Sequence, residues 1–99
     1  MAEDLEESND NVVIKIHRME MPNEMKLKAL EEIKIALSHH SIEKDIATYM
    51  KRKFDELYPK TTWHCIAGKG FGCSIAYSTQ FLIFFQVDQM YFLLFKSAE

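Results

Sequence analysis

The sequence is poor in the residues that hold small secreted or metal-binding domains together. Its 99 residues include only two cysteines, Cys65 and Cys73. A disulfide framework needs more cysteines, and this spacing matches no zinc site. No apolar run approaches the roughly 20 residues that span a bilayer. We therefore expect reduced thiols, no metal or other cofactor, and no insertion into a membrane.

The charge pattern lacks the features of a nucleic-acid-binding or secreted protein. The formal net charge is −3, and the 12 lysines and arginines form no single stripe. Nucleic acid is therefore not an expected partner. The acidic N-terminus has neither the basic region nor the apolar region of a secretory signal. We expect a soluble protein of the cytoplasm.

The length is that of one domain. Residues 1–12 are mostly acidic and polar, so they bury too little apolar surface to fold, and we predict a disordered tail there. The domain itself is predicted to span residues 13–97. It starts with a short strand over Val12–Met19, where apolar and polar residues alternate after a β-branched start.

A first helix is predicted over Met21–His40. Pro22 suits the first helical position. One apolar stripe recurs at spacings of three and four, and its members are Met25, Ala29, Leu30, Ile33, Ala36 and Leu37. Leu27 and Ile35 lie off this stripe and indicate a second contact surface.

A second helix is predicted to begin after Ser41, a good N-cap, and to end before Pro59. Its apolar residues recur about every four positions, at Ile42, Ile46, Met50, Phe54 and Leu57. We interpret the basic cluster Lys51–Lys53 as a solvated face. The first backbone amides, at Ile42–Lys44, stay unsatisfied unless something accepts them.

The rest of the chain is predicted to be β structure. The expected strands are Thr62–Ala67, Phe71–Tyr77, Phe81–Val87 and Met90–Lys96. The second of these begins near glycines and holds small residues at 73, 74 and 76, so it packs weakly on its own sheet and lets another backbone approach. We expect it to pair outside its own sheet. The order of elements predicts an α+β domain with two helices packed on an antiparallel sheet.

A cysteine enzyme is one alternative that the residues leave open. His64 and Cys65 are consecutive in a strand and point to opposite faces, so they cannot form a nucleophile–base pair with each other. Cys73 with His64 remains possible, but no orienting acid or oxyanion hole is recognisable. We expect no enzymatic activity.

Several short blocks of sequence, considered together with their order and spacing, form a distinctive pattern. They are Ile42-Glu43-Lys44-Asp45-Ile46-Ala47, Lys51 with Phe54-Asp55, Trp63-His64-Cys65-Ile66 with Gly68, Phe71-Gly72, and Leu93-Leu94-Phe95-Lys96-Ser97. With one extra residue in the Tyr58–Thr62 turn, this joint pattern resembles the LL-type cytoplasmic dynein light chains, which are small dimeric hub proteins. The resemblance covers about Ile14–Ser97 and marks a divergent member.

The resemblance implies a strand-swapped two-fold homodimer, in which Phe71–Tyr77 crosses to the partner protomer's sheet. The free edge of that strand would accept an extended client peptide by β-augmentation, in two symmetric grooves. Clients in the family are disordered segments, often with a Thr-Gln-Thr core, and dynein intermediate chain is among them. The family performs no catalysis and works in the cytoplasm on the microtubule cytoskeleton.

Site residues are carried over from the resemblance by position. The implied peptide-binding residues are Glu43, Lys44, Phe71, Gly72, Cys73, Ser74, Ile75, Ala76, Tyr77, Leu82, Phe84 and Gln86. The implied dimer-interface residues are Trp63, His64, Phe71, Cys73 and Ile75. A client glutamine would cap the amides of Glu43 and Lys44. His64 matches the family's pH-sensitive histidine, and Ser97 matches a serine that can be phosphorylated.

The groove departs from the family pattern at several of these positions. Ser74, Ala76 and Tyr77 replace the usual aromatic, threonine and histidine. Leu82 replaces phenylalanine, and Phe84 and Gln86 replace two tyrosines. Backbone pairing would survive these changes, whereas client preference depends on side chains. The alternative function is therefore a divergent paralogue that keeps the fold in a structural or membrane-associated role without binding the usual clients.

Overall fold

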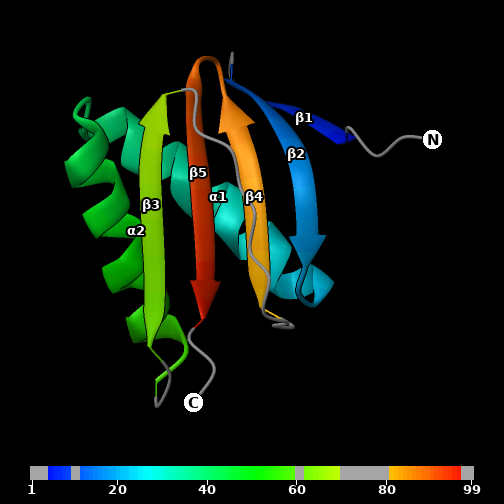
Figure 1. Ribbon diagram of the computed structural model, residues 1–99, viewed down its shortest axis with the longest axis vertical. Coiled ribbons are helices and arrows are strands. Elements are labelled where there is room, and N and C mark those ends of the chain that lie inside the picture. The colour runs from blue at the N-terminus through cyan, green and yellow to red at the C-terminus, as the bar shows by residue number, and fades with distance from the viewer. Residues whose placement is uncertain (1–4, 10–11, 60–61, 70–80, 97–99) are drawn as a thin grey trace.

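The computed structural model describes residues 5–9, 12–59, 62–69 and 81–96, which form five strands and two helices (Figure 1). In chain order these are β1 Leu5–Asn9, β2 Val12–Glu20, α1 Asn23–His39, α2 Glu43–Leu57, β3 Trp63–Lys69, β4 Leu82–Val87 and β5 Met90–Lys96. The predicted α+β class, with two helices on an antiparallel sheet, is confirmed. The predicted strand Phe71–Tyr77 lies outside the described residues.

All the described strands belong to one antiparallel sheet in the order β1-β2-β4-β5-β3. β4 and β5 form the centre, as Figure 1 shows. The register between β2 and β4 shifts between Ile16 and Arg18. Such a bulge bends the strand and increases its twist.

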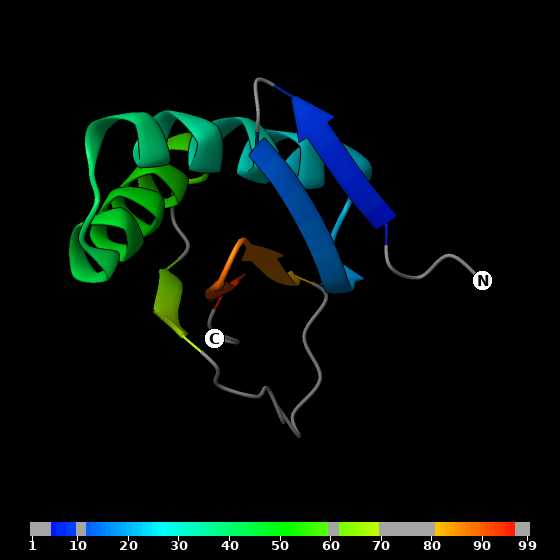
Figure 2. The same cartoon turned by 90° about the horizontal axis from the view of Figure 1, so that it is seen from above.

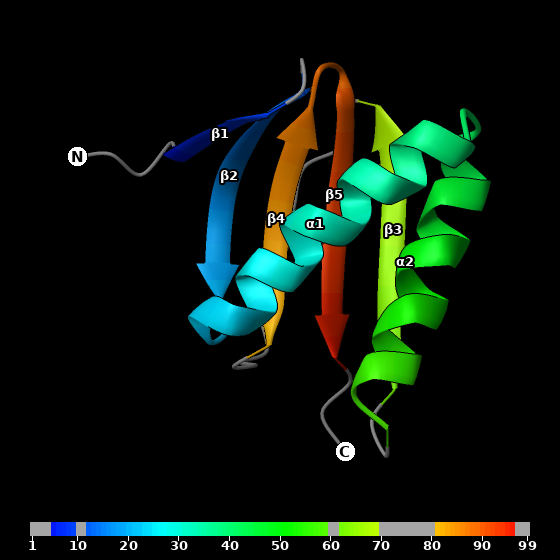
Figure 3. The ribbon, with the colours of Figure 1, turned by 180° about the vertical axis from the view of Figure 1, so that it is seen from behind.

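Both helices lie on the same face of the sheet (Figures 2 and 3). α1 crosses β4 and β5 diagonally, whereas α2 runs alongside β3 (Figure 3). On β4, Ile83, Phe85 and Val87 alternate toward the helices and belong to the core. The core residues of the helices are Ala29, Leu30, Ile33, Ala36, Ile46, Met50 and Phe54. The predicted apolar stripes are therefore the faces that pack on the sheet.

The turn between β4 and β5 consists of Asp88 and Gln89. Asp88 has a φ of 55°, in the left-handed region where a side chain is disfavoured. Asp and Asn tolerate this region better than most residues other than glycine. The predicted hairpin therefore forms without a glycine.

The N-terminal segment differs from the prediction. Leu5–Asn9, expected within a disordered tail, forms β1 and pairs with Val12–Ile16 of β2. Pairing along a strand edge uses backbone groups, so a segment poor in apolar residues can still join a sheet. The hydrophobic pattern, which governed the prediction, carries no information on such pairing.

Both helices begin one residue later than predicted. Pro22 is the N-cap of α1 and accepts hydrogen bonds from the backbone N–H groups of Met25 and Lys26. Ile42, not Ser41, is the N-cap of α2. The prediction of Ser41 as the cap is therefore wrong, because the helix entry places an apolar side chain where a hydroxyl was expected.

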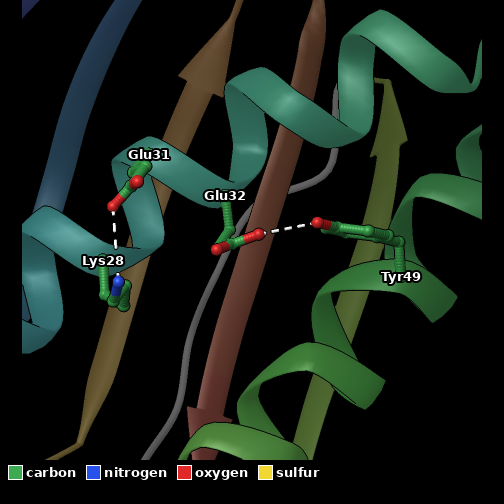
Figure 4. Close-up of polar contacts among 4 residues, drawn as sticks. All are labelled: Lys28, Glu31, Glu32 and Tyr49. Atoms are coloured by element: carbon green, nitrogen blue, oxygen red, sulfur yellow. Dashed lines mark hydrogen bonds and ion pairs between the residues drawn. The ribbon is translucent and has the colours of Figure 1, made fainter.

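One polar contact joins the two helices inside the protein (Figure 4). The Tyr49 hydroxyl of α2 donates a hydrogen bond of 2.7 Å to the Glu32 carboxylate of α1, which is 5% exposed. Burial and this bond raise the pKa of Tyr49 to about 12. Lys28 and Glu31 form a separate, more exposed ion pair on α1. The Glu32–Tyr49 bond therefore fixes α1 against α2.

Within the described residues, no helix is long and apolar enough to cross a membrane.

Candidate functional site

A cleft of about 670 Å³ lies between α2 and β3. Figure 3 shows the helix and the strand side by side. The residues that line it are Lys44, Ala47, Thr48, Lys51 and Arg52 of α2, His64, Cys65 and Ile66 of β3, and Phe95 of β5. Two predicted site residues, Lys44 and His64, thus reach one site from opposite walls.

The cleft follows a strand edge. Among the described strands, β3 is last in the sheet and pairs only with β5. A strand at the edge of a sheet presents a row of N–H and C=O groups for another strand. Ile66 adds an apolar side chain that is 48% exposed. This arrangement suits an extended peptide.

The helical wall of the cleft is cationic. Lys44, Lys51 and Arg52 line it, and its described lining includes no carboxylate. Sequence reasoning missed Lys51 and Arg52, because a basic cluster on a helix usually faces solvent. The four-residue spacing of Lys51 and Asp55 was a signal that this face carries an ordered interaction.

Asp55 fastens the two walls together. Its Oδ1 accepts a hydrogen bond of 2.8 Å from the backbone N–H of Trp63, the first residue of β3. Its Oδ2 accepts a short hydrogen bond from Lys51 Nζ. Burial acts to raise the pKa of Asp55, but the bonds from Lys51 and Trp63 outweigh it and lower that pKa. The ionised carboxylate therefore sets where β3 begins relative to α2.

The start of α2 has no side-chain cap. Ile42 occupies the N-cap position with φ −98° and ψ 130°, and its side chain makes no capping hydrogen bond. The Ile42 carbonyl accepts the backbone N–H groups of Asp45 and Ile46. Glu43 and Lys44 form the first turn, where helix amides lack carbonyl partners within the helix. This end of the helix can therefore accept a polar group from outside.

Trp63 lies in the core of the protomer. Its side chain is fully buried, and its ring packs edge-on against Phe54 at 4.8 Å between centroids. Tyr58 and Phe81 complete the aromatic cluster. The indole N–H has no hydrogen-bond acceptor among the described residues. Its ring therefore anchors β3 to α2. The prediction that Trp63 lies at a dimer interface stays a prediction, because the structure holds one protomer.

The predicted residues of β4 lie away from the cleft. β5 separates β4 from β3, and Phe84 and Gln86 alternate with the core residue Phe85, so they point away from the helices. Gln86 is hydrogen-bonded at both ends of its amide. His17 Nε2–H donates to its Oε1 at 2.8 Å, and its Nε2 donates to the Asp88 carbonyl at 2.8 Å.

Aromatic rings surround His17 on the same face. Its centroid lies 5.5 Å from that of Phe84 and 5.8 Å from that of Tyr91. Leu82, a further predicted groove residue, is fully buried. The described part of one protomer therefore does not bring Leu82, Phe84 and Gln86 together with Lys44 and His64. No pattern in the sequence indicated the contact between His17 and Gln86.

The remaining predicted site residues, Phe71, Gly72, Cys73, Ser74, Ile75, Ala76 and Tyr77, lie outside the described residues. Cys65 is described, and burial raises the pKa of its thiol to about 12. A thiol with this pKa is protonated near neutral pH, whereas the reactive nucleophile is the thiolate. Cys65 is therefore poorly suited to covalent catalysis.

Residues 13–97 match the family described as Dynein light chain type 1. The chain is also similar to a protein of Debaryomyces hansenii named "Dynein light chain 1, cytoplasmic". The two are 44% identical over 79 residues, which are 80% of this chain and 86% of that protein.

Solved structures agree on the fold. Two structures of the dynein light chain-like domain of the Fasciola hepatica calcium binding protein FhCaBP2, a mercury derivative and a native one, superpose with TM-scores of 0.72 and 0.78, each at 22% identity. The first match covers 87% of this chain and 93% of that domain, and the second covers 90% and 95%. At this identity the likeness concerns the fold alone.

Proposed function

The chain belongs to the dynein light chain family, and from this premise we propose that it is a non-enzymatic, dimeric adaptor of a dynein-type motor complex. It would bind extended segments of partner proteins, dynein intermediate chain among them, in the cytoplasm on the microtubule cytoskeleton. The observation that carries the proposal is the cleft along the edge of β3 beside α2.

The cleft supports strand exchange between two protomers. The partner's segment Phe71–Tyr77 would pair with the edge of β3, and this protomer's segment would do the same in return. Such an exchange is isologous, so it closes as a two-fold dimer. The exposed Ile66 would then be covered, and the buried indole N–H of Trp63 would come within reach of new acceptors.

The client would add one further strand. After the exchange, the outer edge of Phe71–Tyr77 faces α2, and an extended peptide can pair with it by β-augmentation. The uncapped amides of Glu43 and Lys44 would receive a polar side chain of the client, such as the glutamine of a Thr-Gln-Thr core. Two grooves on one dimer would raise the effective concentration of a second partner segment once the first is bound.

The hydrogen bonds of Gln86 favour the alternative function. Gln86 replaces a tyrosine usual in the family, and both ends of its side-chain amide are hydrogen-bonded, one to His17 and the other to the Asp88 carbonyl. A side chain held in this way is less available to a client. The alternative is a paralogue that keeps the dimeric fold in a structural role but binds no Thr-Gln-Thr segment.

The dimer is tested by sedimentation of His64→Lys at neutral pH. His64 lines the cleft and is half-buried, so a permanent cation there would be trapped when the partner strand covers it. We expect monomers. Lys69→Ala is the matched control, because Lys69 is exposed on the same strand and does not line the cleft. An unchanged sedimentation coefficient for His64→Lys rejects the proposed interface.

A further inference from the structure

The outer edge of β2 carries a run of residues that favour pairing with another strand. Val12–Ile16 reads Val-Val-Ile-Lys-Ile, so four of five residues are β-branched and one is charged. High β-propensity and low charge favour pairing with another strand. β2 lies toward the opposite side of the sheet from β3 and the cleft. Its edge is therefore a surface distinct from the proposed client site.

β1 covers this run and nothing else. Leu5 lies opposite Ile16 and Asn9 lies opposite Val12, so the five residues of β1 pair with the five residues of Val12–Ile16. His17–Glu20, the rest of β2, extends beyond β1. Figures 1 and 2 show β1 flanking only one part of β2. The match between the covered segment and the β-branched run is complete.

The composition of β1 differs from that of the strand it covers. It reads Leu-Glu-Glu-Ser-Asn, which is rich in residues depleted from strands. In the register of the two strands, Glu6 is the partner of Lys15. Charged residues on an outermost strand discourage further strand addition. β1 thus replaces a β-branched edge with an acidic one.

We propose that Leu5–Asn9 is an intramolecular cap that competes with a second copy of this chain for the edge of β2. A second copy fits because the run is self-complementary. An antiparallel β2–β2 pair centred on Ile14 sets Val12 against the other copy's Ile16, and Ile14 against Ile14. β-branched residues opposite each other stabilise an antiparallel pair, and a pair of this kind is two-fold.

The cap is effective because it is tethered. Only residues 10 and 11 separate β1 from β2, and so short a link gives an effective concentration of roughly millimolar. A two-stranded hairpin is by itself only marginally stable, so the cap opens more readily than the core. At ordinary protein concentrations the tethered strand excludes the second copy. Loss of the first nine residues removes that advantage.

The test compares three variants of the protein. One lacks residues 1–9, a matched control lacks residues 1–4 and keeps β1, and a third carries Glu6→Lys with Glu7→Lys at full length. Sedimentation velocity is measured over a hundredfold range of protein concentration, and backbone hydrogen exchange is followed at Val13, Ile14 and Lys15. Exchange in β5 reports whether each variant is folded.

For the form lacking residues 1–9, we expect a species of twice the mass of the control to appear as concentration rises. At low concentration we expect at least tenfold faster exchange at those of the three amides that bond to β1, and unchanged exchange at those that bond to β4. The double-lysine form should change in the same direction, because Glu6→Lys sets a like charge in register with Lys15. Equal masses and equal exchange in all three forms overturn the proposal. Because each proposed dimer carries two β2 edges, larger multiples of the control's mass should follow at the highest concentrations. Client binding should not change, which separates this proposal from the adaptor function.

Discussion

Supplying α2 with its own N-cap should stabilise the protein and weaken client binding together. Ile42 is 61% exposed and already has the extended backbone of an N-cap residue, so Ile42→Ser changes the capping group with little loss of burial. A serine cap is worth about 1 kcal/mol of stability. If a client glutamine occupies the same amides, it must displace the serine and loses about that free energy, which corresponds to roughly fivefold in Kd.

Two assays on the same samples decide the matter. Urea unfolding, at one fixed protomer concentration because the protein is proposed to be a dimer, gives the change in stability. Calorimetric titration with a Thr-Gln-Thr peptide gives the change in Kd. Ile42→Val is the control, since valine is also β-branched and cannot cap. A serine variant that is more stable but binds with unchanged affinity refutes the idea that the client caps α2.

Substitutions at Asp55, at the Tyr49–Glu32 pair and at Asp88 test contacts that hold the fold together. Asp55→Ala should cost about 2 kcal/mol, because a buried backbone N–H loses a charged acceptor, and Asp55→Asn about half as much. Folding lowers the pKa of Asp55 from its ordinary value of 3.8, so the ionised carboxylate stabilises the protein above pH 3.8 and this stability is lost as the pH falls further. The free energy of unfolding of Asp55→Asn should therefore depend less on pH in acid. Tyr49→Phe should lower the free energy of unfolding by about 1.5–3 kcal/mol, because the Glu32 carboxylate loses its hydrogen bond, and adding Glu32→Leu should restore part of that stability. Because folding raises the pKa of Tyr49 to about 12, its contribution to stability should disappear as the pH rises from 10 to 12. Asp88→Gly should be neutral or stabilise by up to about 1 kcal/mol, whereas Asp88→Val should destabilise, as thermal unfolding would show. A loss on Asp88→Gly larger than 1 kcal/mol would mean that the Asp88 side chain, and not its backbone angle, matters.

Regular hydrophobic patterns were read correctly from the sequence. The bounds predicted for the last strand, Met90–Lys96, agree with β5, and the predicted helices differ from α1 and α2 only at their ends. These elements bury one face, so their periodicity is imposed by the core and is visible in the residues. Cap positions are less visible, because the difference between Ser41 and Ile42 depends on the path of the chain into the helix.

Features that depend on backbone pairing, or on two elements lying side by side, were not predicted. β1 has no periodic apolar face, and its order comes from the edge of β2. Lys51 and Arg52 face a cleft only because β3 returns alongside α2. The contact between His17 and Gln86 joins residues 69 positions apart, which no local pattern reports. In each case the missing information is tertiary.

Two residues named by the resemblance line the described cleft. They are Lys44, assigned to peptide binding, and His64, assigned to the dimer interface, and they are 20 positions apart in sequence. Phe84 and Gln86 do not join them within the described part of one protomer. β5 separates the strand that carries them from the cleft, and no local sequence pattern reports this order of strands.

The most direct test of the adaptor proposal is a calorimetric titration of the intact protein with a peptide that carries the Thr-Gln-Thr core, with the mass of the protein measured by sedimentation in the same buffer. We predict a dimer that binds one peptide per protomer with micromolar affinity. A folded dimer that releases no heat and shows no binding would contradict the account of the groove, and would favour the paralogue in which Gln86 and its neighbours serve the fold alone.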